Sequence, residues 1–465
     1  MTLFDRYIKG VRFLLPTPFT IAIALTLITM VFAIIWPWSN TTVIASNYTE
    51  KFTLVIQFWN KGLWDTNGLA FAIQMMLMLL LGHVFALSPI IEKGIKRLLP
   101  ICKTNARSAA LISFTTLIIS WFNWGLGLVF GAIFCKKLLE YAHDKKLPLN
   151  AGLIGAAGYC GLMVWHGGIS GSSLIKIAEP GHLATLVSPQ YEHQVPHLID
   201  FKSTVFSTSN LIITAILFLV LPLTIYFIGK KVKTRIPEEY KLSSKKVINK
   251  KLIGAERFDH SKITGSIIGG LLLVLCTYLA ISHPNTLSFR FITPNFLNLS
   301  LLALALISHG SITNFLTASE SAIGGTVGIL LQFPLYFGIM GIFQTTGIIQ
   351  DLSHFFQHIS SEFTYPIYTF FSAGLINFFV PSGGGQWYIQ GPLIIQSALE
   401  MGIPLHKSIM ALAYGDQITN MMQPFWALPL LGITGLKAKD ILPYTFLLML
   451  VGIGVFVFGL LFFII

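Results

Sequence analysis

The chain has 465 residues, of which 54% are hydrophobic and only 11% are charged, and its formal net charge is +12. A soluble domain carries about 25% charged residues, so the composition excludes an ordinary soluble enzyme, a disordered protein and a nucleic-acid-binding protein. The four cysteines are spread too thinly for a disulfide framework or a metal site. The composition therefore predicts an all-α polytopic membrane protein.

The N-terminal segment 1–16 is charged and precedes an apolar run that has no small-residue cleavage site. We interpret it as the start of a retained first membrane helix rather than a signal peptide. A helix needs about 20 apolar residues to cross a bilayer. About nine full spans are predicted on this criterion, at 17–38, 68–91, 151–178, 204–229, 263–283, 295–312, 321–350, 410–435 and 441–465.

Two further uncharged runs break in the middle on Gly, Pro and Asn, at 123–127 and at 381–385. Each limb beside a break is about 10 to 17 residues long, which is shorter than a full span. Backbone freed by such a break is tolerated in a membrane only where protein or a wet cavity surrounds it. We therefore predict two re-entrant helical hairpins, at 106–141 and 363–400, with kinked ordinary spans as the alternative.

The distribution of Lys and Arg predicts the orientation. With a cytoplasmic N-terminus, 25 of the 31 basic residues fall in inside segments and 5 in outside segments, while Lys176 lies near a helix end. Positive charge concentrates on the inside of membrane proteins, so this split supports the predicted topology. It puts the C-terminus in the periplasm and makes residues 230–262 a basic cytoplasmic linker.

The linker separates two units, 1–229 and 263–465, that share one order of elements. In each unit a hairpin is followed by an interrupted helix, predicted at 150–178 and at 408–435. The first hairpin enters the membrane from the inside and the second from the outside, so the repeats are inverted. Inverted repeats with discontinuous helices are typical of secondary transporters, whose binding site lies where the breaks meet.

The breaks supply groups that can bind ions. A broken helix exposes N–H groups at one end, which favour an anion, and C=O groups at the other, which favour a cation. No Lys or Arg lies in a break, which favours a small monocarboxylate over a di- or tricarboxylate. The predicted substrate-binding residues are Asn123, Gly125, His166, Gly167, Ser170, Ser172, Ser382, Gly383, Gly384 and Gln386. The predicted cation-binding residues are Asp416, Thr419, Asn420 and Gln423.

Two of these residues are ionisable, and an ionisable residue within a membrane is a functional candidate by default. For Asp416 we expect cation coordination or proton transport, with a helix cap or a structural hydrogen bond as the alternative. For His166 we expect contact with the substrate or a proton, with a purely structural histidine as the alternative.

Several segments resemble the bacterial short-chain fatty acid transporter family, which is associated with acetoacetate and butyrate. They are Val380-Pro-Ser-Gly-Gly-Gly-Gln-Trp387, Val164-Trp-His-Gly-Gly-Ile-Ser-Gly-Ser172, Asn123-Trp-Gly-Leu-Gly127 and Tyr414-Gly-Asp-Gln417. That family belongs to a superfamily of ion-coupled transporters with paired re-entrant hairpins. The resemblance covers nearly the whole chain, and it implies an elevator-type homodimer in the bacterial inner membrane.

The leading hypothesis is a transporter, not an enzyme, that moves a short-chain monocarboxylate together with Na⁺ or H⁺. It needs no cofactor, with Na⁺ as a candidate coupling ion, and its partners are the substrate and the lipid bilayer. The alternative is an intramembrane acyltransferase that uses His166 as general base beside a serine. A channel is a third hypothesis. The preferred acid and the coupling ion stay open.

Overall fold

The computed structural model describes residues 16–38, 47–89, 97–187, 189–233, 256–282 and 293–464, with a few isolated positions outside these ranges. Helices and turns make up these ranges, and no β-strand occurs in them, which agrees with the predicted all-α class. Most of the predicted linker 230–262 lies outside the described residues.

Six helical segments in the described ranges are long and apolar enough to cross a membrane. They are α2 (Pro18–Ile35), α4 (Thr66–Ala86), α10 (Thr208–Lys231), α12 (Lys262–Ile281), the consecutive helices α14 (Ile312–Ala322) and α15 (Val327–Thr346), and α21 (Ala438–Gly459). The other three predicted spans contain the shorter apolar helices α8 (Ala151–Tyr159), α13 (Pro294–His309) and α20 (Pro424–Thr434). The number of nine crossings stays a prediction.

Two helices lie in segments that the sequence analysis treated as outside connections. They are α3 (Tyr48–Leu63) and α16 (Ile348–His358). Asn47 caps α3, because its side-chain oxygen accepts a hydrogen bond from the Glu50 N–H at 2.9 Å. α3 packs along α15 at Gly62, where a Cβ atom would overlap the Phe337 carbonyl oxygen and lie 2.9 Å from Gly341 Cα. A glycine is needed there because the two backbones touch.

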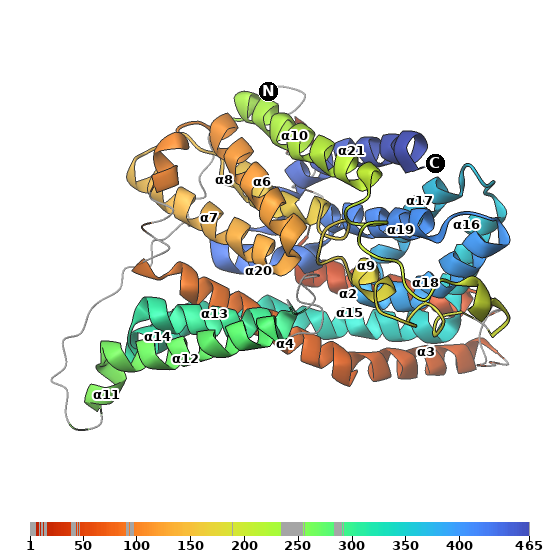
Figure 1. Ribbon diagram of the computed structural model, residues 1–465, viewed down its shortest axis with the longest axis horizontal. Helices are drawn as coiled ribbons and strands as arrows, with labels where there is room; N and C mark the ends of the chain where they lie inside the picture. The colour runs from red at the N-terminus through yellow and green to blue at the C-terminus, as the bar shows by residue number, and fades with distance from the viewer. Residues whose placement is uncertain are drawn as a thin grey trace.

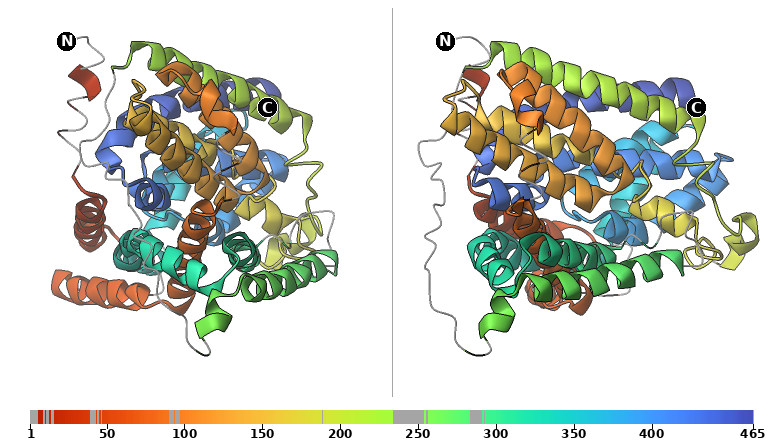
Figure 2. Two further views of the ribbon diagram at one scale, coloured as in Figure 1. Left: turned by 90° about the vertical axis from the view of Figure 1, so that its left-hand side faces the viewer. Right: turned by 60° about the vertical axis from the view of Figure 1, so that its left-hand side comes forward.

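The helices form two layers (Figures 1 and 2). One layer, the lower in Figure 1, contains α2, α3, α4, α12, α13, α14 and α15, which pack on one another. The other contains two helical hairpins, the interrupted helices, α10 and α21. Hairpin 1 is α6 (Asn105–Phe122) with α7 (Trp124–Asp144), and hairpin 2 is α17 (Tyr365–Asn377) with α18 (Gly383–Glu400).

The interrupted helices lie at the centre of the second layer. The first runs through α8, the turn at Cys160–Met163 and α9 (Ser172–Ile177). The second runs through α19 (Leu405–Thr419), the turn at Asn420–Met422 and α20. Every residue of α8 is buried, as is every residue of α19 from Ser408 onward. Most of these positions hold apolar or small side chains, so the breaks that follow are enclosed by protein.

Helix α12 shows how the outside of the molecule differs from this centre. Its exposed side chains are large and apolar, and Leu271, Val274 and Ile281 are 66%, 67% and 71% exposed. Its few buried residues are mostly small, such as Gly265 and Gly269. An apolar helix with a solvent-avoiding outer face and all backbone groups bonded internally is suited to contact with lipid.

The two hairpins open toward opposite ends of α10, a helix about 36 Å long at 1.5 Å per residue. At its C-terminal end, the Asn105 side chain at the base of hairpin 1 donates to Val232 O at 3.3 Å. In the segment that precedes α10 in the chain, the Tyr191 hydroxyl donates to Glu400 at the base of hairpin 2, at 2.6 Å. The opposed arrangement is the one that inverted repeats require, although the repeat boundaries stay a prediction.

Three of the four hairpin limbs are longer than the 10 to 17 residues expected. α6, α7 and α18 have 18, 21 and 18 residues, and α17 has 13. They are longer because the helices continue beyond the apolar stretch into charged residues such as Arg107 and Glu400. The glycines of the breaks are also placed differently, because Gly125 and Gly383 lie in the first turns of α7 and α18 instead of outside them.

Candidate functional site

The two interrupted helices meet where each of them breaks. The Tyr159 hydroxyl, at the end of α8, lies 2.7 Å from Asn420 O and 3.1 Å from Gln423 O. These carbonyl groups belong to the second break, where the helix changes to extended backbone at Gln423. Asn420 O also accepts from the Gln423 N–H at 3.1 Å. A fully buried tyrosine of the first unit therefore bonds backbone carbonyls of the second.

The tips of the two hairpins have the same local geometry. Asn123 and Ser382 are the N-caps of α7 and α18, with φ near −150° in both. Asn123 Oδ1 accepts from the Leu126 N–H at 3.0 Å, and Ser382 Oγ accepts from the Gly385 N–H at 3.2 Å. The two predicted residues are therefore equivalent, and the offset between the hairpins is 382 − 123, or 259 residues.

Hairpin 1 is held at its tip by the first break and by the other layer. The Trp124 N–H donates to Ser170 Oγ at 3.0 Å, which brings the predicted residue Ser170 to the tip. A Cβ atom at Gly125 would lie 2.7 Å from Met78 Sδ of α4. Gly125 is thus packed against a neighbouring helix and leaves no open space beside it.

Hairpin 2 ends directly over the two ionisable residues. A Cβ atom at Gly383 would lie 2.8 Å from the Trp165 ring, 2.9 Å from His166 Cε1 and 3.3 Å from Asp416 Oδ2. At Gly384, by contrast, a Cβ atom would meet no described atom within 4 Å. The structure therefore brings Gly383, His166 and Asp416 together and leaves space beside Gly384.

His166 and Asp416 form a buried pair, with exposed fractions of 0% and 1%. His166 Nδ1 is hydrogen-bonded to Asp416 Oδ2. Its Nε2 accepts from the Ser173 backbone N–H at 3.2 Å and lies 2.9 Å from Ser173 Oγ. Because a backbone N–H can only donate, Nε2 is the acceptor, and the ring proton of neutral His166 lies on Nδ1 and faces the carboxylate.

Other side chains fix the backbone at the pair. Gln417 Oε1 accepts from the N–H groups of His166 at 2.8 Å and Gly167 at 3.2 Å. Asn210 Nδ2 donates to Gly167 O at 2.9 Å, and the Tyr414 hydroxyl donates to Asn210 Oδ1 at 2.7 Å. The sequence analysis missed Gln417, Asn210 and Tyr414 as supports of Gly167. Their signal is the presence of polar groups in otherwise apolar helices.

The order Asp416, His166, Ser173 is that of a catalytic triad, which is relevant to the enzyme alternative. All three side chains are buried, with Ser173 at 0% exposed. The serine that bonds His166 is Ser173, which is not among the predicted site residues: α9 starts at Ser172, and the N–H of the next residue donates to the imidazole ring. The role of Ser172 in substrate binding stays a prediction.

Three oxygen atoms of the second break surround one nitrogen atom. Asn377 Nδ2, at the end of α17, lies 2.6 Å from Asp416 O, 2.9 Å from Thr419 Oγ1 and 2.8 Å from Asn420 Oδ1. We call these three acceptors the oxygen cluster. An amide nitrogen carries only two hydrogens, so it cannot donate fully to all three. The cluster has spare capacity to accept, which is the property of a cation site.

Three of the four predicted cation-binding residues, Asp416, Thr419 and Asn420, meet in the oxygen cluster, although Asp416 does so through its backbone. The fourth residue, Gln423, does not present an oxygen to the cluster; its side-chain Nε2 donates to the backbone carbonyl of Asn377. Asn377 itself was missed, and its only signal was an amide within an uncharged run. In the described residues no group of three or more His, Cys, Asp or Glu side chains could hold a metal ion.

Gln386 lies inside hairpin 2 rather than beside the pair of ionisable residues. Its Nε2 donates to Ala373 O and to Gln390 Oε1, both at 2.9 Å. A ring of tryptophans lies nearer the breaks. Trp124 is 5.2 Å from Trp426 and 6.1 Å from Trp165 between ring centroids, and Trp165 stacks on His166 at 4.5 Å.

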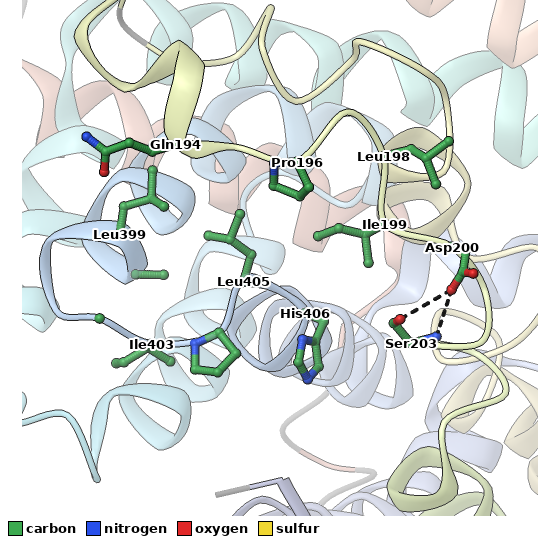
Figure 3. A pocket seen from close by; sticks show the side chains of 13 residues that line it. Gln194, Pro196, Leu198, Ile199, Asp200, Ser203, Leu399, Ile403, Leu405 and His406 are labelled. Atoms are coloured by element: carbon green, nitrogen blue, oxygen red, sulfur yellow. Dashed lines mark hydrogen bonds between the residues drawn. The ribbon is translucent and has the colours of Figure 1, made fainter.

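A cavity of about 660 Å³ lies away from the breaks, at the base of hairpin 2 (Figure 3). Its wall is mostly apolar, with Leu198, Ile199 and Leu405 facing it, and Asp200 accepts from the Ser203 N–H at 3.1 Å. None of the predicted substrate or cation residues lines it.

A family model described as short chain fatty acid transporter matches residues 3–463. A relative in Escherichia coli is 35% identical over 451 residues, and one in Haemophilus influenzae is 35% identical over 454 residues. Each alignment covers 96% of both chains, and both relatives are provisionally named short-chain fatty acid transporters.

Two solved structures resemble the chain more distantly, each at 14% sequence identity. One is MtrF of Neisseria gonorrhoeae, described as illuminating a class of antimetabolite efflux pumps, with a TM-score of 0.42 and coverage of 97% of each chain. The other is the YdaH transporter of Alcanivorax borkumensis, with a TM-score of 0.40, covering 96% of this chain and 98% of that one.

Proposed function

The chain belongs to the short chain fatty acid transporter family, and from this premise we propose that it is a secondary active transporter that moves short-chain monocarboxylates with a coupling cation. Because the family and its relatives are transporters and the chain has apolar membrane-length helices, a membrane transporter rather than an enzyme is the established frame. The substrates, the cation and the residues named below are our proposal.

The observation that carries the proposal is the meeting of both hairpin tips with both breaks. Trp124 bonds Ser170 at one tip, and Gly383 touches His166 and Asp416 at the other. A site assembled from both inverted halves can open to one side or the other as the halves exchange conformations, which is the arrangement of secondary transporters.

The start of α18 is proposed to bind the carboxylate of the substrate. The N–H groups of Gly383 and Gly384 lie in the first turn and have no partner within the helix. Helix N-termini favour anions, and the space beside Gly384 leaves room for one. Since no Lys or Arg lies in a break, a second carboxylate would have no countercharge, which favours a monocarboxylate such as acetoacetate or butyrate.

The oxygen cluster is proposed to bind Na⁺. It offers a backbone carbonyl, a hydroxyl and an amide oxygen, which are hard neutral oxygen ligands, and Asn377 can add a fourth through its own amide oxygen once the amide turns. H⁺ is the second candidate, supported by the buried pair His166 and Asp416, which can hold a proton between two ionisable groups.

The two layers support an elevator-type mechanism. The layer with α3, α4, α12 and α15 would form a fixed scaffold in a homodimer, and the layer with the hairpins would move across the membrane. We place the protein in the bacterial inner membrane with the N-terminus in the cytoplasm and the C-terminus in the periplasm.

The test is uptake of labelled butyrate into proteoliposomes, with the Na⁺ gradient and the pH gradient varied separately. Accumulation driven by one gradient supports the proposal and identifies the ion, whereas flux without accumulation contradicts coupling and indicates a channel. If H⁺ is the coupling ion, Asp416→Asn is expected to abolish accumulation because it removes the carboxylate that bonds His166, with Ile395→Leu in the same preparation as the matched control. Accumulation driven by the pH gradient at the wild-type level in Asp416→Asn would show that the proton site lies elsewhere.

A further inference from the structure

The interior of hairpin 2 is polar along its length. On α17, Thr369 and Ser372 are buried, and on α18 Gln386, Gln390 and Ser397 are buried. The spacing of three, four and seven residues places each set on one side of its helix, and contacts between the sets show that the two sides face each other. A polar stripe therefore faces a polar stripe within a pair of otherwise apolar helices.

These side chains form a hydrogen-bonded row. Gln386 Nε2 donates to Gln390 Oε1 at 2.9 Å, and Gln390 Nε2 donates to Ser372 Oγ at 2.9 Å. Gln386 Oε1, at the inner end, is fully buried and has no hydrogen-bond partner among the described residues. Gln386 lies one turn after Ser382, so the row ends next to the tip of the hairpin.

The outer end of the row opens into a small cavity. Its volume is about 20 Å³, which is enough for one water molecule. Ser372 and Gln390 line it from the inside, and Gln357 of α16 lines it from the base of the hairpin. Gln357 Nε2 lies 3.3 Å from Glu400 Oε2. The row thus leads, by way of the cavity, to an exposed carboxylate.

A buried row of polar side chains costs free energy in a membrane protein, which suggests that it has a function. Buried amides in a membrane helix cost free energy, and an amide oxygen without a partner costs more than one that is bonded. Water in the cavity would satisfy part of the row, and a cation passing along it would find amide, hydroxyl and carboxylate oxygens in sequence.

Hairpin 1 shows that the hairpin geometry does not need this row. With the offset of 259 residues, Gln386 and Gln390 correspond to Gly127 and Gly131. A Cβ atom at Gly127 would lie 2.6 Å from Ser120 Cα of α6. One at Gly131 would overlap the Gly158 carbonyl oxygen of α8 and lie 3.0 Å from Thr116 Cγ2 of α6. The equivalent positions are therefore closed by direct contact with α6 and α8.

We propose that the interior of hairpin 2 is a hydrated passage through which the coupling cation reaches the site from the side of Glu400. The proposal rests on the cation coupling proposed above, and it names the route by which that ion enters. The route is separate from the space beside Gly384, so the cation and the monocarboxylate would enter by different paths.

The first test asks whether a small cation enters the hairpin. Ag⁺ is a monovalent cation that reacts with thiols, and the four native cysteines are buried. In proteoliposomes, external Ag⁺ is expected to block the new thiol of Ser372→Cys, which is measured by maleimide labelling after denaturation. The thiol of Thr116→Cys, inside hairpin 1, is expected to stay unblocked, as are the thiols of the wild type.

Equal blocking of Ser372→Cys and Thr116→Cys, or no blocking of either, would overturn the passage. If Ser372→Cys does not fold, Ser397→Cys lines the same cavity and replaces it. This readout needs no transport, so it stays informative even if labelled butyrate is not transported and the proposed function fails.

The second test asks whether the passage serves coupling. Gln390→Leu keeps the volume and removes the polar row, and Ile395→Leu on the same helix is the control. The external Na⁺ or H⁺ concentration for half-maximal uptake is expected to rise about tenfold in Gln390→Leu, with the butyrate KM at saturating cation changed by less than about twofold. An unchanged cation requirement in this variant, or an equal rise in KM for butyrate, would refute a separate route.

Discussion

The two hairpins have the same backbone geometry at their tips but different side chains between their helices. Both have an N-cap in the same conformation, at Asn123 and at Ser382, and they open toward opposite ends of the molecule. Between its helices, hairpin 1 has Gly127 and contact with Ser120, whereas hairpin 2 has Gln386 at the equivalent place and a hydrogen-bonded row. The comparison teaches that two hairpins can share the backbone geometry of a tip while one uses its interior for packing and the other for polar groups.

The largest effect is expected when hairpin 1 is opened. In Gly127→Ala the new methyl group would overlap Ser120 Oγ, and α6 and α7 would have to separate. Overpacking in a closed interior costs about 1–3 kcal/mol, and we expect the upper end because backbone atoms of Ser120 are also in the way. Thermal unfolding in detergent should show a lower midpoint and a lower yield of folded protein.

The matched control is Gly384→Ala at the other tip, where a methyl group meets no described atom within 4 Å. Its unfolding midpoint is expected to stay near that of the wild type. If both variants unfold alike, the close contact between Gly127 and Ser120 does not limit stability.

The next effect concerns the cation. Asn377→Ala removes the side chain that organises the oxygen cluster. Ile118 lies five residues before the cap of hairpin 1, as Asn377 lies five before that of hairpin 2, and it is 43% exposed. Losing one ligand or hydrogen bond worth about 1.4 kcal/mol should raise the half-saturating cation concentration about tenfold. Cation titration of butyrate uptake measures this, with Ile118→Ala expected to behave like the wild type. A comparable loss in both variants would argue against a site in the second half alone.

A smaller effect is expected at the caps, where the hairpins are alike. Asn123→Ala and Ser382→Ala each remove a side-chain acceptor for an N–H of the first turn. Loss of an N-cap costs about 1 kcal/mol, so both variants should lower the unfolding midpoint by a few degrees and by similar amounts. A large loss at only one of them would mean that the two tips are not equivalent.

The smallest effect concerns the base of hairpin 2. Hydrogen bonds from Tyr191, and then from Gln396, hold the pKa of Glu400 below its usual range. A lowered folded-state pKa stabilises the protein above the ordinary pKa, and this contribution is lost as the pH falls through the lowered pKa. Protease cleavage of the segment 189–194 should therefore increase in acid below about pH 4, the ordinary range of a glutamate.

The control for this effect is Glu400→Gln, which cannot titrate. Its cleavage is expected to be the same at neutral and acid pH. An acid-dependent increase in this variant equal to that of the wild type would assign the effect to another group.

The sequence was sufficient for the helical class and for the family, because hydropathy and the motifs around Trp165 and Ser382 are local signals. It also indicated Asp416, Thr419 and Asn420 together, since the three are close in the chain and lie at one break. It could not indicate Asn377, whose hydrogen-bond partners lie 39 or more residues away in the chain. Nor could it indicate Ser173, which bonds His166 because of where the short helix α9 begins.

The helices α3 and α16 were missed for a different reason. Each is amphipathic, with polar residues on one face and too few apolar ones to resemble a span, so hydropathy treats it as a connection. The close approach of Gly62 to α15 depends on a residue nearly 280 positions later, which no local pattern contains. Likewise, the difference between Gln386 in hairpin 2 and Gly127 in hairpin 1 can be recognised only after the N-caps at Asn123 and Ser382 have aligned the two hairpins.

The hydroxyl of Tyr159, shared between the carbonyls of Asn420 and Gln423, has a consequence for the history of the chain. Since one half provides the phenol and the other provides both acceptors, neither half is a self-sufficient module. A hybrid gene that joined the first half of this protein to the second half of a distant relative would keep the phenol, but it would need a second half whose break holds its backbone carbonyls in the same place. The two halves are therefore bound to diverge in step.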